Sequence, residues 1–206
     1  MTSFDTAPTA FADRLRACWK FPALALVLLC ASVPAPALAG PISGTYVLSP
    51  AQIDTGFSVR VLGRGSVNGQ FNKVSGKMVL DQNRPEKSRV SVTIDLASVE
   101  TDNDKVTGFL KSSAMFDVAK YPLADFRSTR VRITGADSAE VEGILTLRGM
   151  KKRTKLSVTV TGTGSDGRVG FEVTGGFLRS LYGMEIGLPI YADKVNLKIS
   201  GTGQRG

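Results

Sequence analysis

Apolar and polar residues alternate over most of the chain after Gly44. The alternating segments are residues 53–61, 90–96, 141–147, 156–160, 169–177 and 195–199, and many of their apolar residues are β-branched. This period of two predicts antiparallel strands with one apolar face and one solvated face.

Clusters of Gly, Asn, Asp and Pro separate these segments at short intervals. They lie at residues 63–65, 81–85, 134–137, 149–152 and 164–167. Such spacing predicts a meander whose neighbouring strands pair through hairpins. Roughly eight strands of this kind can pack as two sheets or close into a barrel, and closure leaves an interior for side chains or one small ligand. We therefore expect an all-β fold.

One segment departs from the strand pattern. In residues 103–116, Val106, Phe109 and Leu110 stand at helical spacing, and Asp102 or Asn103 is placed to cap the start. We expect a short helix or helical loop there.

The first 39 residues match the pattern of a secretory signal peptide. Basic residues precede the apolar run 21–31, and Ala37-Leu38-Ala39 supplies the small residues that signal peptidase needs. A membrane anchor would need about 20 apolar residues, and a lipoprotein signal at Cys30 would need a small residue before it. We therefore expect cleavage after Ala39 and a single periplasmic domain of residues 40–206.

Composition narrows the chemistry of this domain. The chain has no histidine, and Cys18 and Cys30 both lie in the segment that we expect to be removed. Thiol chemistry, disulfides and a histidine base are therefore excluded, and we expect no metal and no cofactor. The net charge of +8 favours contact with anionic membrane surfaces, and the expected export argues against nucleic acid. The basic turn at residues 151–153 fits either a solvated loop or such a contact.

Acidic pairs are the nearest approach to a catalytic site. Asp102 and Asp104 lie where a helix start favours acids, and Glu140 and Glu142 fall on the outward face of a strand. No serine stands beside a base, and no glycine-rich stretch fits a phosphate loop. We therefore expect a protein that is not an enzyme.

Several motifs, in order along residues 46–184, resemble the YceI-like family of polyisoprenoid-binding periplasmic proteins. The matching stretches are Tyr46-x-Leu48-Ser49, Phe57-x-Val59-x-Val61-Leu62-Gly63, Val67-x-Gly69-x-Phe71, residues 99–103, 109–112 and 115–122, residues 141–150, and Leu178-Arg179-Ser180-Leu181-Tyr182-Gly183-Met184. The resemblance implies a lipocalin-like antiparallel β-barrel of about eight strands, with one extended isoprenoid chain along its axis. It also leaves open a homodimer.

The chain departs from this family at three positions. Gln52, Val61 and Phe109 stand where members often carry histidines. If those histidines contact a ligand head group in other members, that contact is lost here, and a more apolar or differently headed ligand is expected.

The candidate ligand-binding residues are mostly the apolar residues of the strands and the helical segment. They are Phe57, Val59, Val61, Phe71, Ile94, Phe109, Leu110, Met115, Phe116, Phe126, Leu145, Phe171, Phe177 and Arg179. Each phenylalanine could equally be ordinary core, and Arg179 could either meet a ligand oxygen or hold its own turn through backbone carbonyls. We expect Phe109 and Phe116 to face the ligand and close one end of the barrel.

Two functions remain. The first is a periplasmic carrier of a long isoprenoid lipid, either a polyprenyl species or an isoprenoid quinone. The second is a structural or stress-related barrel with a filled core and protein partners.

Overall fold

The computed structural model describes residues 42–164 and 166–206. These residues belong to one unit, Leu38–Gly206. The proposed signal peptide, residues 1–39, lies outside the described residues, so its cleavage after Ala39 stays a prediction.

Eleven strand segments build the sheet. They are β1 (Gly44–Leu48), β2 (Ile53–Val61), β3 (Gly65–Phe71), β4 (Val74–Leu80), β5 (Arg89–Asp95), β6 (Val99–Thr101), β7 (Leu123–Ile133), β8 (Ser138–Leu147), β9 (Met150–Thr163), β10 (Arg168–Leu178) and β11 (Tyr191–Arg205). All the pairings are antiparallel.

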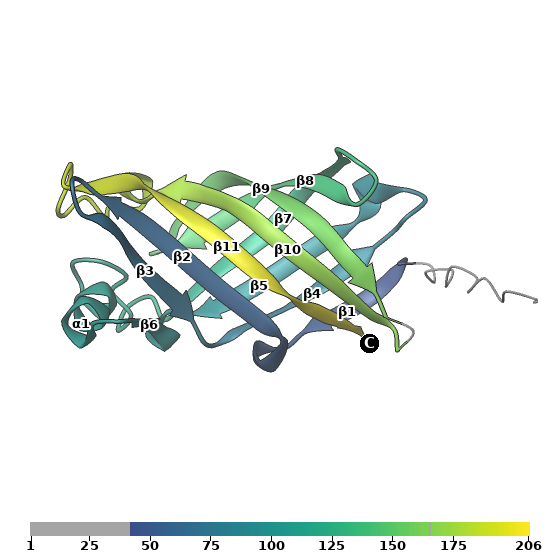
Figure 1. Ribbon diagram of the computed structural model, residues 1–206, viewed down its shortest axis with the longest axis horizontal. Coiled ribbons are helices and arrows are strands. Elements are labelled where there is room, and N and C mark those ends of the chain that lie inside the picture. The colour runs from purple at the N-terminus through teal and green to yellow at the C-terminus, as the bar shows by residue number, and fades with distance from the viewer. Residues whose placement is uncertain (1–41, 165) are drawn as a thin grey trace, which may run out of the picture. The chain divides into compact units, whose positions relative to one another are not determined.

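The segments amount to eight long strands, because the first three long strands are each interrupted. The first comprises β1 and β2, which are separated by a 3-10 turn at Pro50–Gln52; β3 with β4, and β5 with β6, form the second and third. Strand β11 pairs with β10 on one side and with β2 and then β1 on the other, where Tyr46 lies opposite Arg205. This last pairing closes the sheet, which confirms the predicted barrel (Figure 1).

The two ends of the barrel differ. The helix end carries α1 (Asp104–Lys111), the β2–β3 turn and the β10–β11 loop, whereas the open end carries the start of β1 and the end of β11 (Figure 1). The side chain of Asn103 caps α1 by accepting hydrogen bonds from the backbone N–H groups of Lys105 and Val106.

The helix is shorter than the segment that the sequence predicted. It ends at Lys111, and the hydroxyl of Ser112 donates a 2.7 Å hydrogen bond to the carbonyl of Phe109. Turns fill the rest of the segment up to Phe116.

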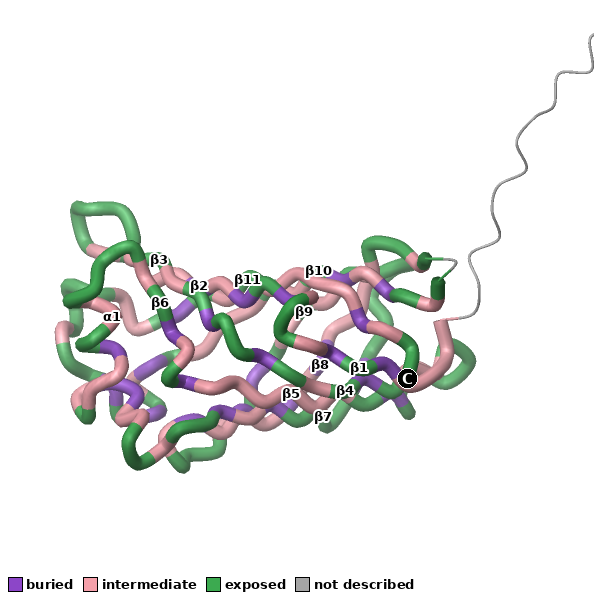
Figure 2. The backbone as a smooth tube through the Cα atoms, turned by 90° about the horizontal axis from the view of Figure 1, so that it is seen from below, coloured by how far each residue is buried: buried purple, intermediate pink, exposed green. Residues whose placement is uncertain are grey.

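The buried apolar residues form one core inside the barrel. Along strands such as β2 and β8, buried residues alternate with partly buried or exposed ones, and Figure 2 shows these classes along the backbone. The acidic pair Glu140 and Glu142 faces outward, as predicted. Lys155 Nζ lies 3.6 Å from a carboxylate oxygen of Glu140 and 3.0 Å from one of Glu142. A hydrogen bond from Lys155 lowers the pKa of Glu142, so this pair has an ordinary surface role.

Candidate functional site: an apolar cavity inside the barrel

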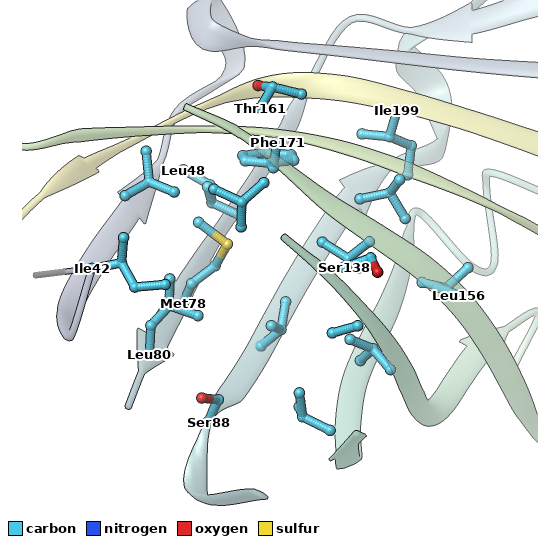
Figure 3. Close-up of a pocket in the computed structure, with 18 of the residues that line it drawn as sticks. Ile42, Leu48, Met78, Leu80, Ser88, Ser138, Leu156, Thr161, Phe171 and Ile199 are labelled. Carbon is cyan, nitrogen blue, oxygen red and sulfur yellow. The ribbon is translucent and has the colours of Figure 1, made fainter. Parts of the chain in front are cut away.

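A large chamber of about 660 Å³ occupies the open half of the barrel. Side chains from most of the barrel strands surround it, and Met78, Leu156 and Phe171 are examples from different parts of the wall (Figure 3). Its apolar lining comprises Ile42, Leu48, Ile53, Val74, Met78, Leu80, Val90, Val92, Ile94, Phe126, Val131, Ile133, Ala139, Val141, Leu156, Val158, Val160, Val169, Phe171, Val173 and Ile199.

The wall stays thin because several large side chains lie against glycines instead of pointing across the barrel. A Cβ at Gly143 would overlap the ring of Phe126, and one at Gly203 would come 2.7 Å from Cε of Met78. Elsewhere valine is the commonest lining residue, and a valine reaches less far across the barrel than Phe or Leu. Flat-lying large residues and short β-branched residues together leave the space that a packed core would fill.

The mouth of the large chamber is polar. Asp81, Gln82, Ser88, Asp137 and Ser138 line it on the β4–β5 and β7–β8 connections. Asp81 accepts hydrogen bonds from the backbone N–H and the side chain of Arg84, and these contacts lower its pKa. Among the described residues that line the large chamber, none is a lysine or an arginine.

A small chamber of about 90 Å³ lies at the helix end. The ring of Phe71 lies between Phe57 and Phe116, with centroid distances of 5.4 and 5.8 Å. Leu110 and Met115 complete the cover over this chamber. The two chambers share Thr55, Ile94 and Ile199 in their walls, so they lie end to end along the barrel interior.

Most of the predicted ligand-binding residues line one of the two chambers. Phe126 and Phe171 border the large chamber, and Ile94 borders both. The small chamber takes the larger share, namely Phe57, Val59, Phe71, Leu110, Met115, Phe116, Leu145, Phe177 and Arg179.

Val61 and Phe109 lie outside both chambers. Phe109 is 44% exposed, whereas its neighbour Leu110 is buried. Successive residues of an α-helix point about 100° apart, so α1 can turn only one of these two side chains into the barrel. The expectation that Phe109 faces the interior is therefore wrong, and Phe116 alone of the two phenylalanines closes this end.

Arg179 holds the β10–β11 loop in shape. Its side chain is 2% exposed, and its guanidinium donates to the carbonyls of Ala192 (3.1 Å), Met184 (2.6 Å), Ile186 (2.9 Å) and Tyr191 (3.0 Å). Burial lowers its pKa, and the nearby Asp193 opposes this shift. The sequence left open whether Arg179 meets a ligand oxygen or holds its own turn, and the structure shows Arg179 holding the turn through backbone carbonyls.

Sequence reasoning missed much of the large chamber, especially the valines of β5, β8, β9 and β10. The signal was present, since these valines occupy the apolar face of the alternating segments. The sequence prediction favoured the larger phenylalanines, and most of these line the small chamber in the better-packed half of the barrel.

Thr55 introduces a hydroxyl group between the two chambers. The residue is 3% exposed, and its Oγ1 has no hydrogen-bond partner in the described part of the chain. An unpaired buried hydroxyl costs stability.

Two further findings concern the described residues alone. None of their helices is long and apolar enough to cross a membrane. They contain no group of three or more Asp, Glu, His or Cys residues that could hold a metal ion.

An antiparallel barrel around an apolar cavity defines the class of this protein. Residues 46–202 match the YceI-like domain. The chain is 33% identical over 153 residues to a UPF0312 protein of Pseudomonas paraeruginosa, covering 72% of this chain and 80% of the relative. It is 32% identical over 151 residues to protein YceI of Escherichia coli, covering 71% and 78% respectively. The chain belongs to the YceI-like family, which confirms the resemblance seen in its motifs.

Solved structures show the same fold. Burkholderia cenocepacia BcnA superposes with a TM-score of 0.69 at 23% identity, covering 75% of this chain and 98% of BcnA. A polyisoprenoid binding domain from Saccharophagus degradans gives a TM-score of 0.62 at 16% identity, covering 80% and 99%. At these identities the likeness concerns the fold alone.

Proposed function

We propose that this protein is a periplasmic carrier that holds one long isoprenoid lipid inside its barrel. The observation that carries the proposal is the large chamber of about 660 Å³ with its predominantly apolar wall. Its volume falls within the range of about 300–1000 Å³ that small-molecule sites occupy. A filled structural core, the alternative function, has no need of such a space.

Burial of apolar surface provides the driving force for binding. Each square ångström of apolar surface removed from water contributes about 25 cal/mol, and the loss of translational and rotational freedom offsets part of this gain. An extended hydrocarbon ligand suits the arrangement of the two chambers along one axis. The small chamber is the inner end of this path, closed by Phe116 and Leu110.

The charge of the lining favours an uncharged ligand over an anionic one. A fatty acid carboxylate would find no lysine or arginine among the described residues of the large chamber wall, and an unpaired charge in an apolar site is strongly unfavourable. A quinone or a free polyprenol carries no such charge. The Saccharophagus degradans protein with the same fold is a polyisoprenoid binding domain, and this likeness supports the isoprenoid class.

Binding, and not catalysis, is the activity that we assign. The chamber wall offers the hydroxyl groups of Thr55, Thr161 and Thr163, and the carboxyl groups of Asp81 and Asp137 stand at the mouth. An acid–base mechanism needs a group poised within reach of the reacting atoms, and the apolar wall around the chamber provides none among the described residues.

Mass spectrometry of an organic extract tests the proposal. The protein is purified without detergent from the bacterium that produces it, and the extract is compared with that of an unrelated exported protein prepared in parallel. We expect an isoprenoid quinone or polyprenol in near-stoichiometric amount in the first extract only. An extract without lipid, or one with only straight-chain fatty acids, would overturn the isoprenoid assignment.

A further inference from the structure

Exposed apolar side chains gather at the helix end of the barrel. Five of them form what we call the apolar rim, which lies on the β2–β3 turn and at the β10–β11 loop: Leu62, Ile186, Leu188, Ile190 and Tyr191. Leu62 is 74% exposed and Ile190 is 57% exposed. Isolated exposed leucines are common, but contiguous apolar patches mark sites of interaction.

The rim is contiguous because its two loops are joined. The backbone N–H of Leu62 donates a 2.8 Å hydrogen bond to the carbonyl of Ile190, and Tyr191 lies opposite Val61 in the β2–β11 pairing. The turn and the loop lie side by side at one end of the barrel (Figure 1). Side chains from distant parts of the sequence therefore share one surface.

The rim is also held in a defined shape. The four hydrogen bonds from Arg179 go to carbonyls in or next to this loop, including those of Met184, Ile186 and Tyr191. Asp193 accepts hydrogen bonds from the backbone N–H and the hydroxyl of Ser180, at 2.8 and 2.7 Å. Buried polar contacts thus fix a loop whose apolar side chains point into solvent.

Basic residues flank the rim. Arg60 and Arg64 lie in and beside the β2–β3 turn and Lys194 lies near the start of β11, all exposed. Glu185 is the exposed acidic residue within the loop itself. Apolar side chains that enter the interface, with basic residues around them, are the combination that binds anionic lipid bilayers.

We propose that the apolar rim docks this protein onto the surface of an anionic phospholipid bilayer. The site is separate from the lipid chamber, whose mouth lies at the opposite end of the barrel, so docking goes beyond the proposed carrier function. A bilayer suits the rim better than a protein partner because the exposed basic residues Arg60, Arg64 and Lys194 outnumber the exposed acidic residue Glu185. The two proposals can be tested independently, because the chamber could fail to bind lipid while the rim still docks on a bilayer, and the rim could fail to dock while the chamber still binds lipid.

Vesicle sedimentation tests the docking site. The purified protein is mixed with vesicles of phosphatidylcholine containing about one-third phosphatidylglycerol, and separately with pure phosphatidylcholine. The rim variant carries Leu62→Ser and Ile190→Ser. The matched control carries Val47→Ser and Val79→Ser, which remove two exposed apolar side chains from the outer faces of β1 and β4, away from the rim. Circular dichroism checks that both variants fold.

We expect the unaltered protein to sediment with the anionic vesicles, and less with the neutral ones. The rim variant should bind the anionic vesicles at least about tenfold more weakly, because it lacks two apolar side chains that docking would bury in the bilayer. The control should bind like the unaltered protein. Replacing Arg60 and Arg64 by Gln should abolish the preference for anionic vesicles.

Three outcomes would overturn the proposal. They are absence of binding by the unaltered protein, equal binding by the rim variant, and equal loss of binding in the control. If light scattering instead detects a dimer that the rim variant abolishes, without vesicle binding, the rim is an interface between two copies of this chain and the proposal is wrong.

Discussion

Phe109 and Phe116 allow a direct comparison of an exposed ring with a buried one in the same segment. Phe116 is 7% exposed, its ring packs 5.8 Å from that of Phe71, and it borders the small chamber. Truncation to alanine would enlarge that chamber, and such substitutions cost about 3–5 kcal/mol. For a domain of this size the melting temperature falls by about 2–4 °C per kcal/mol, so Phe116→Ala should lower it by roughly 6–20 °C.

Phe109→Ala is the matched control. The side chain is 44% exposed, and surface substitutions usually change the free energy of unfolding by less than about 0.5 kcal/mol. We therefore expect a change in melting temperature below about 2 °C.

Calorimetry on both variants after removal of bound lipid provides the measurement. Lipid retention by the reloaded variants is measured alongside, and Phe109→Ala should retain lipid fully. A large destabilisation by Phe109→Ala, or a small one by Phe116→Ala, would refute the assignment of Phe116 as the residue that closes this end.

Three further predictions follow from individual buried groups. Thr55→Val removes an unpaired buried hydroxyl and should raise the free energy of unfolding in urea by about 1–3 kcal/mol. Thr154 is also buried, but its hydroxyl is not among the unpaired buried groups, so Thr154→Val should lower the free energy of unfolding; a loss of stability in both variants would count against the reasoning. Arg179→Met leaves four carbonyls without their donor. It should cost at least about 3 kcal/mol of unfolding free energy and speed hydrogen exchange in residues 183–191, and unchanged exchange there would contradict its role in the loop. Burial raises the pKa of Tyr182. The stability that the neutral Tyr182 side chain contributes is therefore complete below the unfolded pKa of about 10, and it is lost as the pH rises through the higher pKa of the folded state. Tyr182→Phe should flatten the fall in stability above about pH 10, and an unchanged pH profile would contradict this.

The fold could be predicted because its strands obey a simple local rule. In β2, β5, β8 and β10 the apolar and polar residues alternate because one face of each strand points into the barrel and the other points outward. The interruptions in the first three long strands could not be predicted, since the 3-10 turn at Pro50–Gln52 and the short gap between β3 and β4 depend on how the sheet bends to close.

The site was harder to predict because cavity and core use the same residues. The sequence leaves Phe126 as either a ligand-binding residue or ordinary core, and only the structure shows that its ring lies over Gly143 in a chamber wall. Cross-strand placement of a glycine beneath a ring depends on register, which is a property of the closed sheet. Likewise, the helical spacing singles out both Phe109 and Leu110, but only the packing of α1 against the barrel decides which of the two side chains is buried.

Ligand loading in a barrel with a blocked chamber tests the central claim most directly. Ala139 lines the large chamber opposite Val158, so Ala139→Phe places a ring in the space that the lipid would occupy. Ser157→Phe adds the same ring to the exposed outer face, where Ser157 lies opposite Glu140, and is the matched control.

Delipidated protein and both variants are titrated with a long-chain isoprenoid quinone, and bound quinone is measured after gel filtration. We predict near-stoichiometric loading of the unaltered protein and of Ser157→Phe, and at least about tenfold weaker loading of Ala139→Phe, because its ring occupies apolar surface that the ligand must contact. Equal loading of all three proteins would contradict binding in the large chamber, and absence of loading in the unaltered protein would contradict the carrier function itself.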